Sequence, residues 1–129
     1  MKEIITDQWQ MLLPEEWFAE QEDETIIIMD EDEVSCVEIT TLLPDAGSDT
    51  QTMLQSLVSE NSCFKTALAE MDAYYHEQED DGMFWREWFC DAEDFVLIVS
   101  HGCELENRGM DDSAVDEMLS TLLIMEDEA

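Results

Sequence analysis

The chain has 129 residues, of which 35 are aspartate or glutamate and only four are lysine or arginine, giving a formal net charge of −31. A field of this sign repels nucleic-acid phosphates and anionic membranes, because binding to either requires lysine and arginine side chains that displace counterions. Hydrophobic residues still make up 45% of the sequence, which is typical of a packed core and too high for a disordered acidic chain. We therefore predict a single α/β domain over residues 1–124, followed by an acidic C-terminal tail at 125–129.

The start of the chain, MKEIITDQWQMLLPEEW, has no apolar run followed by a small-residue cleavage site and so does not resemble a signal peptide. Uncharged runs such as residues 95–103 are far shorter than the roughly 20 apolar residues of a membrane span. The cysteines then indicate reduced thiols, although their even number keeps disulfides possible: Cys36, Cys63, Cys90 and Cys103. Together these features predict a cytoplasmic protein.

The first predicted elements are strands. In residues 6–18, large apolar side chains occupy alternate positions: Trp9, Met11 and Leu13. Residues 24–30 and 33–43 are rich in β-branched side chains and flank an acidic tip at 30–32, which is typical of an antiparallel hairpin. In its second arm we expect Val37 and Ile39 to share a face with Ser35 and Thr41.

After Pro44 and Gly47, the spacing of apolar residues changes from the alternation of a strand to the spacing of a helix. Ser48 or Asp49 can accept hydrogen bonds from the first free N–H groups of a helix, and Gln51 completes a capping-box pattern with Ser48. Apolar side chains then fall on one helical face: Met53, Leu54, Leu57 and Val58. The sequence thus predicts a helix over residues 49–58.

Residues 64–78 allow two interpretations. A helical stripe would join Phe64, Ala67, Leu68, Met71 and Tyr74 or Tyr75. In a long strand, one face would instead mix apolar side chains with Glu70 and Asp72. Periodicity alone favours the helix.

Residues 83–90 and 95–103 predict a second hairpin, because both runs are short and the acidic segment 91–94 between them is turn-like. One face of the first arm would carry Phe84, Arg86, Trp88 and Cys90, and the other Trp85, Glu87 and Phe89. Residues 95–99 are apolar on both faces, as expected of a strand inside the sheet.

The clearest helix lies at the end of the chain, over residues 111–124. Asp111, Asp112 and Ser113 offer capping groups. Apolar residues then follow at helical spacing: Val115, Met118, Leu119 and Leu122.

This order of elements resembles the PsbP/DcrB-like superfamily. The resemblance spans most of residues 9–123 and rests on LLPEEW near the start, WREW, FVLIVSHGC and the final VDEMLSTLL. It implies an α+β fold in which an antiparallel sheet of about five to six strands lies between helical layers, an α/β/α sandwich. It also implies that residues 64–78 form a strand and that the protein binds a partner without catalysis, because most members are binding proteins.

Searches for catalytic or metal-binding patterns give little. Residues 30–41 lack the glycine and the closing glutamate of an EF-hand, which leaves only loose cation binding at the acidic tip. His101 and Cys103 alternate on one strand face, but the cysteines and histidines show no zinc-site spacing. Ser100 and His101 supply residue types found in nucleophilic catalysis, without a surrounding motif. We predict no enzyme, no cofactor and no metal site.

The aromatic cluster of residues 84–89 also has two interpretations. As core, its two faces pack against the helices at 49–58 and 111–124, and Arg86 is an ion-paired residue at the rim, beside Glu70 or Asp72. As a site, one face stays partly open and presents aromatic rings surrounded by carboxylates to a cationic surface.

The charge has two interpretations. It can provide solubility or suit a high-salt habitat, or it can attract a basic protein partner over a long range, and we favour the second interpretation. The best concrete hypothesis is an immunity or inhibitor protein that occludes a basic toxin or enzyme. Alternatives are a chaperone or adaptor for a secreted effector and a DNA mimic that binds a DNA-binding protein. The predicted partner-binding residues are Asp30, Glu31, Asp32, Glu33, Glu77, Glu79, Asp80, Asp81, Trp85, Trp88, Asp91, Glu93 and Asp94.

Overall fold

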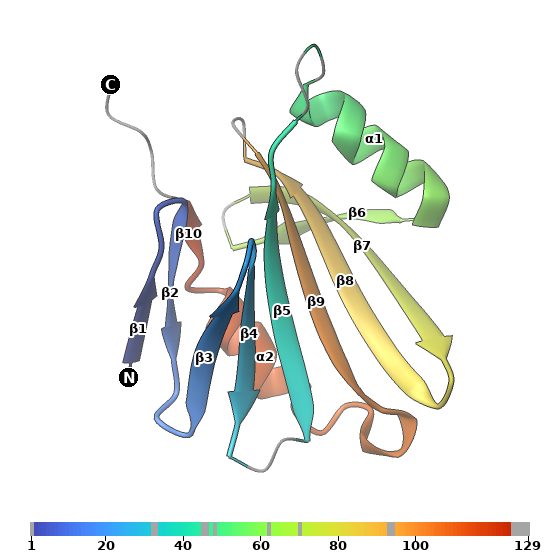
Figure 1. Cartoon of the computed structure of the whole chain (residues 1–129). Coiled ribbons are helices and arrows are strands. Elements are labelled where there is room, and N and C mark those ends of the chain that lie inside the picture. The colour runs from blue at the N-terminus through green and yellow to red at the C-terminus, as the bar shows by residue number, and fades with distance from the viewer. Residues whose placement is uncertain are drawn as a thin grey trace.

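The computed structural model describes residues 2–31, 34–44, 47, 49–61, 63–69, 71–92 and 95–124. Within these residues the chain forms a mixed α+β fold with a seven-stranded sheet, a three-stranded sheet and two α-helices, and all strand pairs are antiparallel (Figure 1). We call the two sheets the large sheet and the small sheet. The predicted antiparallel sheet is present, but the large sheet alone has seven strands where five to six were expected.

The N-terminal part supplies five of the strands described: β1 (Lys2–Ile5), β2 (Trp9–Leu13), β3 (Trp17–Glu22), β4 (Thr25–Asp30) and β5 (Ser35–Leu42). β2 alternates buried and half-buried residues, which confirms the period-two pattern predicted around Trp9. β4 and β5 form the predicted hairpin. The face of β5 that carries Val37 and Ile39 is buried, as expected.

The remaining elements are α1 (Thr50–Asn61), β6 (Phe64–Leu68), β7 (Met71–Asp80), β8 (Met83–Asp91), β9 (Val96–Glu104), a 3-10 turn η1 (Leu105–Asn107), α2 (Asp112–Leu119) and β10 (Leu123–Ile124). Asp49 caps α1, because its Oδ1 accepts a hydrogen bond of 2.8 Å from the N–H of Thr52. Ser48, the other predicted cap, lies outside the described residues. Among the helices described, none is long and apolar enough to cross a membrane.

The large sheet has the strand order β3-β4-β5-β9-β8-β7-β6, with β9 in the interior as its apolar sequence predicts. We call its two sides the core face and the open face. The core face carries Ile28, Val37, Ile39 and Val99, all fully buried. The open face carries the residues between them in sequence, which are more accessible.

Different layers cover these two faces (Figure 1). On the core face, α2 and the small sheet (β1-β2-β10) contribute Trp9, Met11, Val115 and Met118 to one hydrophobic cluster with the large sheet. On the open face, α1 packs at one end through Leu54, which contacts Phe89 and Val96. The remainder of the open face has no layer over it among the described residues. The predicted sandwich of helical layers is therefore only partly correct.

The helix favoured by periodicity over residues 64–78 is wrong. β6 and β7 form a hairpin that reverses at Ala69, whose φ is +55°, so this segment contains two strands rather than one. The reversal places Leu68 directly opposite Met71; Leu68 belongs to the main hydrophobic cluster and Met71 packs against it. Pairing with β8 along most of β7 decides the outcome, because it satisfies the backbone N–H and C=O groups of this segment through contacts that its periodicity does not contain.

The last helix ends earlier than the predicted residue 124. α2 stops at Leu119, and Leu123 pairs with Gln10 of β2. Thr121 helps to fix this turn, because its Oγ1 accepts a hydrogen bond of 2.9 Å from the N–H of Leu12. Val115, Met118, Leu119 and Leu122 are all buried, as predicted. The predicted tail at 125–129 lies outside the described residues.

Candidate functional site

A row of small and apolar residues crosses the open face from β3 to β8. Backbone pairing aligns Phe18 with Met29, Met29 with Cys36, Cys36 with Gly102, and Gly102 with Trp85. We call these residues the apolar row. Phe18 is exposed and Met29, Cys36 and Trp85 are half-buried, so a partner can reach the row from solvent.

Trp85 lies flat on the sheet within this row. A Cβ added at Gly102 would lie 2.3 Å from Cζ3 of Trp85 and 2.5 Å from its Cε3, which shows that the six-membered ring covers the glycine backbone. Only a residue without a side chain allows this approach. One side of the indole therefore contacts β9, and the half-buried ring offers its other side for contact.

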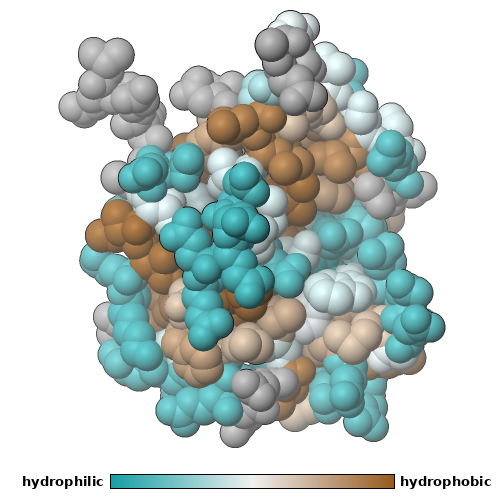
Figure 2. All heavy atoms as spheres, viewed as in Figure 1, coloured by the Kyte–Doolittle hydropathy of each residue, from teal (hydrophilic) through white to brown (hydrophobic). Residues whose placement is uncertain are grey.

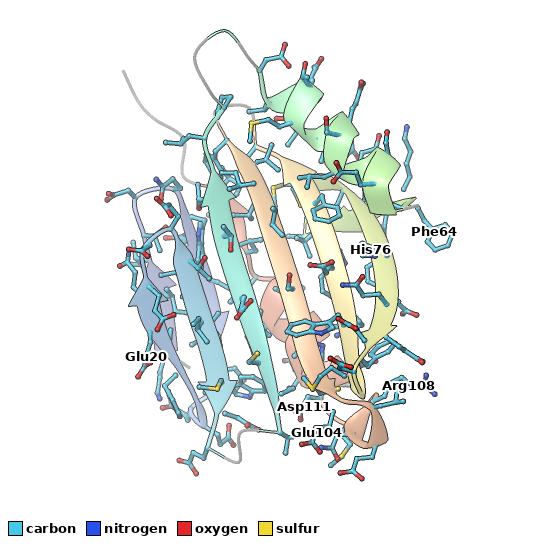
Figure 3. All side chains as sticks on the ribbon, turned by 45° about the vertical axis from the view of Figure 1, so that its right-hand side comes forward. Glu20, Phe64, His76, Glu104, Arg108 and Asp111 are labelled. Atoms are coloured by element: carbon cyan, nitrogen blue, oxygen red, sulfur yellow. The ribbon has the colours of Figure 1, made fainter. Side chains whose placement is uncertain are left out.

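A second row, nearer to α1, carries acidic residues. Pairing aligns Glu20, Ile27, Glu38, Ser100, Glu87 and His76 in this order, and we call it the acidic row. Ser100 donates a hydrogen bond of 2.9 Å from Oγ to Oε2 of Glu87, and Nε2 of His76 lies 2.8 Å from the other oxygen. Glu87 is thus held in place, whereas Glu20 extends freely into solvent (Figure 3).

The thiol of Cys36 belongs with the apolar row in its chemistry. Burial raises its pKa, and the charge of Glu38 raises it further. Cys36 is therefore a neutral, weakly polar side chain at physiological pH.

The surface of the open face alternates between hydrophilic and apolar patches, as Figure 2 shows.

The acidic turns predicted to bind a partner lie at opposite ends of the large sheet. The turns after Asp30 and Asp80 are at the end that carries the apolar row, since Met83 pairs with Glu104 and Cys36 with Gly102. Asp91 is at the other end, where it pairs with Val96. The structure therefore places Asp30, Glu31, Asp80 and Asp81 at the same end of the large sheet, with β5, β9 and β8 between β4 and β7, and Asp91 at the other end. Asp32, Glu33, Glu93 and Asp94 lie outside the described residues.

Three further predicted residues do not lie on the open face. Trp88 is 7% exposed and packs in the main hydrophobic cluster on the core face. Glu77 accepts a hydrogen bond of 2.5 Å from the hydroxyl of Tyr75, and Oε1 of Glu79 lies 3.3 Å from Nη1 of Arg108. Trp85 alone of the predicted aromatic pair belongs to the apolar row.

The predicted rim position of Arg86 is wrong, and so is its pairing with Asp72; Glu70 lies outside the described residues. Arg86 is 7% exposed on the core face, where Nη1 donates a hydrogen bond of 3.0 Å to Oδ1 of Asp116. Its guanidinium carbon lies 5.0 Å from the ring centroid of Trp88. The reason is that α2 covers this face and brings its aspartates over the strand.

Arg86 also fixes the state of His101. Its Nε lies 3.1 Å from Nδ1 of His101 and donates to it, so this nitrogen is an acceptor. Burial first, and the positive charge of Arg86 second, lower the pKa of His101 to about 4. The imidazole is therefore neutral near pH 7.

The fold separates the candidate catalytic residues, whereas the candidate metal pair His101 and Cys103 shares one face of β9. Ser100 and His101 are neighbours in β9 and project from opposite faces, so they do not form a nucleophile–base pair. Burial raises the pKa of the Cys103 thiol, which disfavours the thiolate that a metal requires. In the part of the chain that the structure describes, no three His, Cys, Asp or Glu side chains are grouped to hold a metal. The open face therefore offers apolar contact, an aromatic ring and carboxylates.

Sequence reasoning missed most of the open face. Phe18, Met29, Cys36 and Glu38 each belong to a strand whose opposite residues form the core, and their sequence positions do not reveal that they align. Gly102 carried a usable signal, because a glycine inside an otherwise apolar strand often marks a close approach. Which ring approaches it depends on strand pairing.

No family model and no curated protein matches the chain. Solved structures do share its fold. A protein from Bacteroides thetaiotaomicron matches with a TM-score of 0.78 and 14% identity over 99% of this chain, and the chain spans 50% of that protein. Cyanobacterial PsbP (CyanoP) from Synechocystis matches with a TM-score of 0.63 and 7% identity, covering 96% of this chain and 92% of CyanoP.

LpqN of Mycobacterium tuberculosis, a protein involved in cell envelope biogenesis, matches with a TM-score of 0.59 and 11% identity over 92% of this chain and 83% of LpqN. At such low identities the likeness extends to the fold alone. The fold is therefore PsbP-like, in agreement with the resemblance found in the sequence.

Proposed function

We propose that this protein is a non-catalytic binding protein that holds a basic protein partner against the open face of the large sheet. The observation that carries the proposal is the placement of Trp85, flat on Gly102 and bordered by the acidic row. Aromatic rings at the centre of an interface contribute strongly to binding, and a cationic side chain over such a ring adds cation–π attraction.

The two kinds of residue on this face have different roles in the proposal. Carboxylates of the acidic row and of the turns at Asp30 and Asp80 accelerate encounter with a positively charged surface, and salt weakens this effect. The apolar row supplies the contact that slows dissociation. In its most concrete form, the protein is an immunity or inhibitor protein that occludes the basic cleft of a toxin or enzyme.

A chaperone or adaptor for a secreted effector is the second candidate, and the apolar row favours it. A partner bound chiefly by Phe18, Met29 and Trp85 would be an apolar segment rather than a basic surface. Its affinity would depend little on salt, because apolar burial is not screened. The salt dependence of binding separates the two candidates.

The experiment is capture of partners from a nuclease-treated lysate with the tagged protein, followed by affinity measurements on the captured protein at 50 and 500 mM salt. Trp85→Ala removes the proposed centre of the face. Phe64→Ala is the matched control, because Phe64 is 70% exposed on the edge strand β6, away from the apolar row (Figure 3).

We expect a basic partner whose affinity falls by on the order of 30-fold or more with Trp85→Ala, as for a central aromatic contact, and is unchanged by Phe64→Ala. High salt should weaken the wild-type complex. Equal losses from both variants, or no effect of Trp85→Ala, would exclude the open face as the binding surface. A captured DNA-binding protein that DNA displaces would instead favour the DNA mimic.

A further inference from the structure

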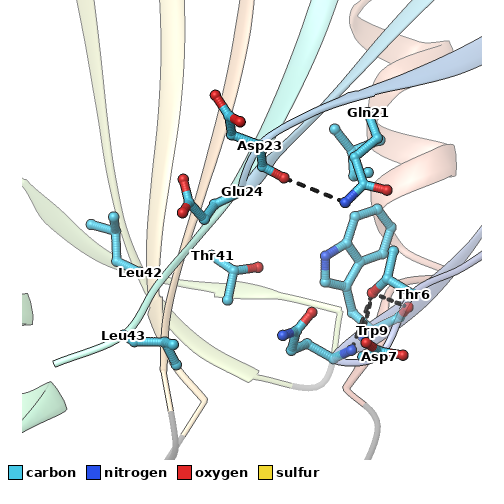
Figure 4. A pocket seen from close by; sticks show the side chains of 11 residues that line it. Thr6, Asp7, Trp9, Gln21, Asp23, Glu24, Thr41, Leu42 and Leu43 are labelled. Atoms are coloured by element: carbon cyan, nitrogen blue, oxygen red, sulfur yellow. Dashed lines mark hydrogen bonds between the residues drawn. The ribbon is translucent and has the colours of Figure 1, made fainter.

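A pocket lies at the end of the large sheet opposite to the apolar row. It has a volume of about 470 Å³ and lies between the β1–β2 turn, the β3–β4 turn and the end of β5 (Figure 4). This volume is within the range of roughly 300–1,000 Å³ that is common for ligand pockets. Its position separates it from the proposed partner surface around Trp85.

The floor of the pocket is Trp9, which is 1% exposed. The backbone of Trp9 is well bonded, because its N–H donates to Oγ1 of Thr6 at 2.9 Å. Its indole nitrogen, in contrast, has no acceptor among the described residues, and Figure 4 shows it on the side of the ring that faces Thr41. Because this N–H faces the pocket, it is available to donate a hydrogen bond to an acceptor of a ligand.

The rim of the pocket is acidic. Asp7, Asp23 and Glu24 are exposed around its opening, and the structure gives none of them a cation partner among the described residues. Asp23 is fixed in the tight β3–β4 turn with φ of +54°, where Gln21 donates a hydrogen bond of 3.3 Å to its carbonyl oxygen.

The cations of the chain are placed elsewhere. Nζ of Lys2 donates to the carbonyl of Trp17, Arg86 bonds to Asp116, and Arg108 contacts Glu79. Lys65 lies on β6, at the edge of the large sheet farthest from β3. Positive charge for the rim therefore has to come from another molecule.

Apolar side chains complete the pocket. Ile26, Leu42 and Leu43 also line it, Ile26 as a buried residue and Leu43 as an exposed one. A ligand that matches all of these features needs a cationic head, an apolar stem and a hydrogen-bond acceptor. A lysine or arginine residue within a peptide has all three, because its backbone carbonyl supplies the acceptor.

We propose that this pocket binds a lysine or arginine residue of a peptide segment, with its cationic head at Asp23 and Glu24 and its backbone carbonyl at the indole N–H of Trp9. A small amine without a carbonyl satisfies the rim but leaves the indole unpaired. An anionic ligand is repelled by the rim. The site is independent of the open face and of the function proposed for it.

The test uses three probes and one readout. The probes are acetyl-Gly-Arg-Gly-amide, the same peptide with uncharged citrulline in place of arginine, and agmatine, which has the guanidinium without a peptide carbonyl. The readout is the Trp9 indole N–H resonance in proton–nitrogen NMR spectra of the full chain, assigned with Trp9→Phe. We expect the arginine peptide to shift this resonance saturably, with agmatine and the citrulline peptide binding at least threefold more weakly.

Charge variants at the rim locate the site. Asp23→Asn with Glu24→Gln should weaken the arginine peptide by about threefold to tenfold, as expected for loss of two exposed ion pairs. Asp80→Asn with Asp81→Asn is the control, because it removes the same charge from a turn at the other end, where Asp81 has a similar φ of +50°. Trp85→Ala, on the open face, should leave peptide binding unchanged.

Several results would overturn the proposal. If the Trp9 resonance does not shift at millimolar arginine peptide, the pocket does not bind this peptide. If the citrulline peptide binds equally well, the pocket does not recognise the positive charge. Equal shifts from agmatine exclude the role of the carbonyl. If both double variants weaken binding alike, the peptide responds to the general field rather than to this pocket.

Discussion

The contact between Trp85 and Gly102 can be tested by adding a single methyl group to the glycine. In Gly102→Ala, the new Cβ would lie 2.3 Å from the indole, where ordinary contact begins at 3.4 Å, so the ring must lift by about 1.1 Å. Overpacking usually costs about 1–3 kcal/mol. Since Trp85 is half-buried and can move outward, we expect the lower part of this range, about 1–2 kcal/mol.

The sign of the effect should reverse when the ring is absent. Glycine inside a strand is less stable than alanine by about 0.5–1 kcal/mol, so Gly102→Ala should be neutral or stabilising in a Trp85→Ala background. The coupling free energy between the two positions is then about 2 kcal/mol. In a Phe64→Ala background, which removes a distant aromatic ring, Gly102→Ala should cost as much as it does in the wild type.

The assay is equilibrium unfolding in urea, because guanidinium is a salt and would also screen the net charge of −31. The free energy of unfolding of the wild type, the single variants and the double variants gives the coupling directly. An equal cost of Gly102→Ala with and without Trp85 would refute the contact. It would also remove the main support for a binding centre on the open face.

Three further predictions concern buried groups. Arg86→Met should lower the free energy of unfolding in urea by about 1–3 kcal/mol, less than the loss of a fully buried pair, because the Asp116 side chain is 58% exposed. For His101, the unfolded state binds a proton near pH 6.5 and the folded state only near pH 4, so stability falls as the pH drops through this window, by about 2 kcal/mol at pH 5. Urea unfolding at pH 7.5 and 5 should therefore show a decrease that is smaller by this amount in His101→Asn; equal decreases would contradict the assignment. Burial raises the pKa of the Cys90 thiol to about 12, so mass spectrometry should find it unmodified by iodoacetamide at pH 8 until urea unfolds the chain.

Local sequence patterns correctly predicted the elements in which the tertiary contacts favour the same secondary structure as the pattern. The alternation around Trp9, the β-branched hairpin of β4 and β5, and the helical spacing of Val115 and Met118 all agree with the structure. The segment containing Tyr75 was predicted incorrectly because its apolar residues fit a helical stripe by chance. Its pairing with β8 is a long-range contact that periodicity does not contain.

For the open face and the pocket, too, some features follow from the sequence and others depend on long-range contacts. Composition and local pattern are enough to give the sign and size of the electrostatic field, the antiparallel character of the sheet and the presence of Trp85 in a segment between acidic clusters. The contact of Trp85 with Gly102, the burial of Trp88 and Arg86 under α2, and the position of Trp9 in an acidic pocket emerge with the folded chain. Alternation fixes which side chains share a strand face, whereas strand register and the covering layers fix which of those faces solvent and a partner can reach.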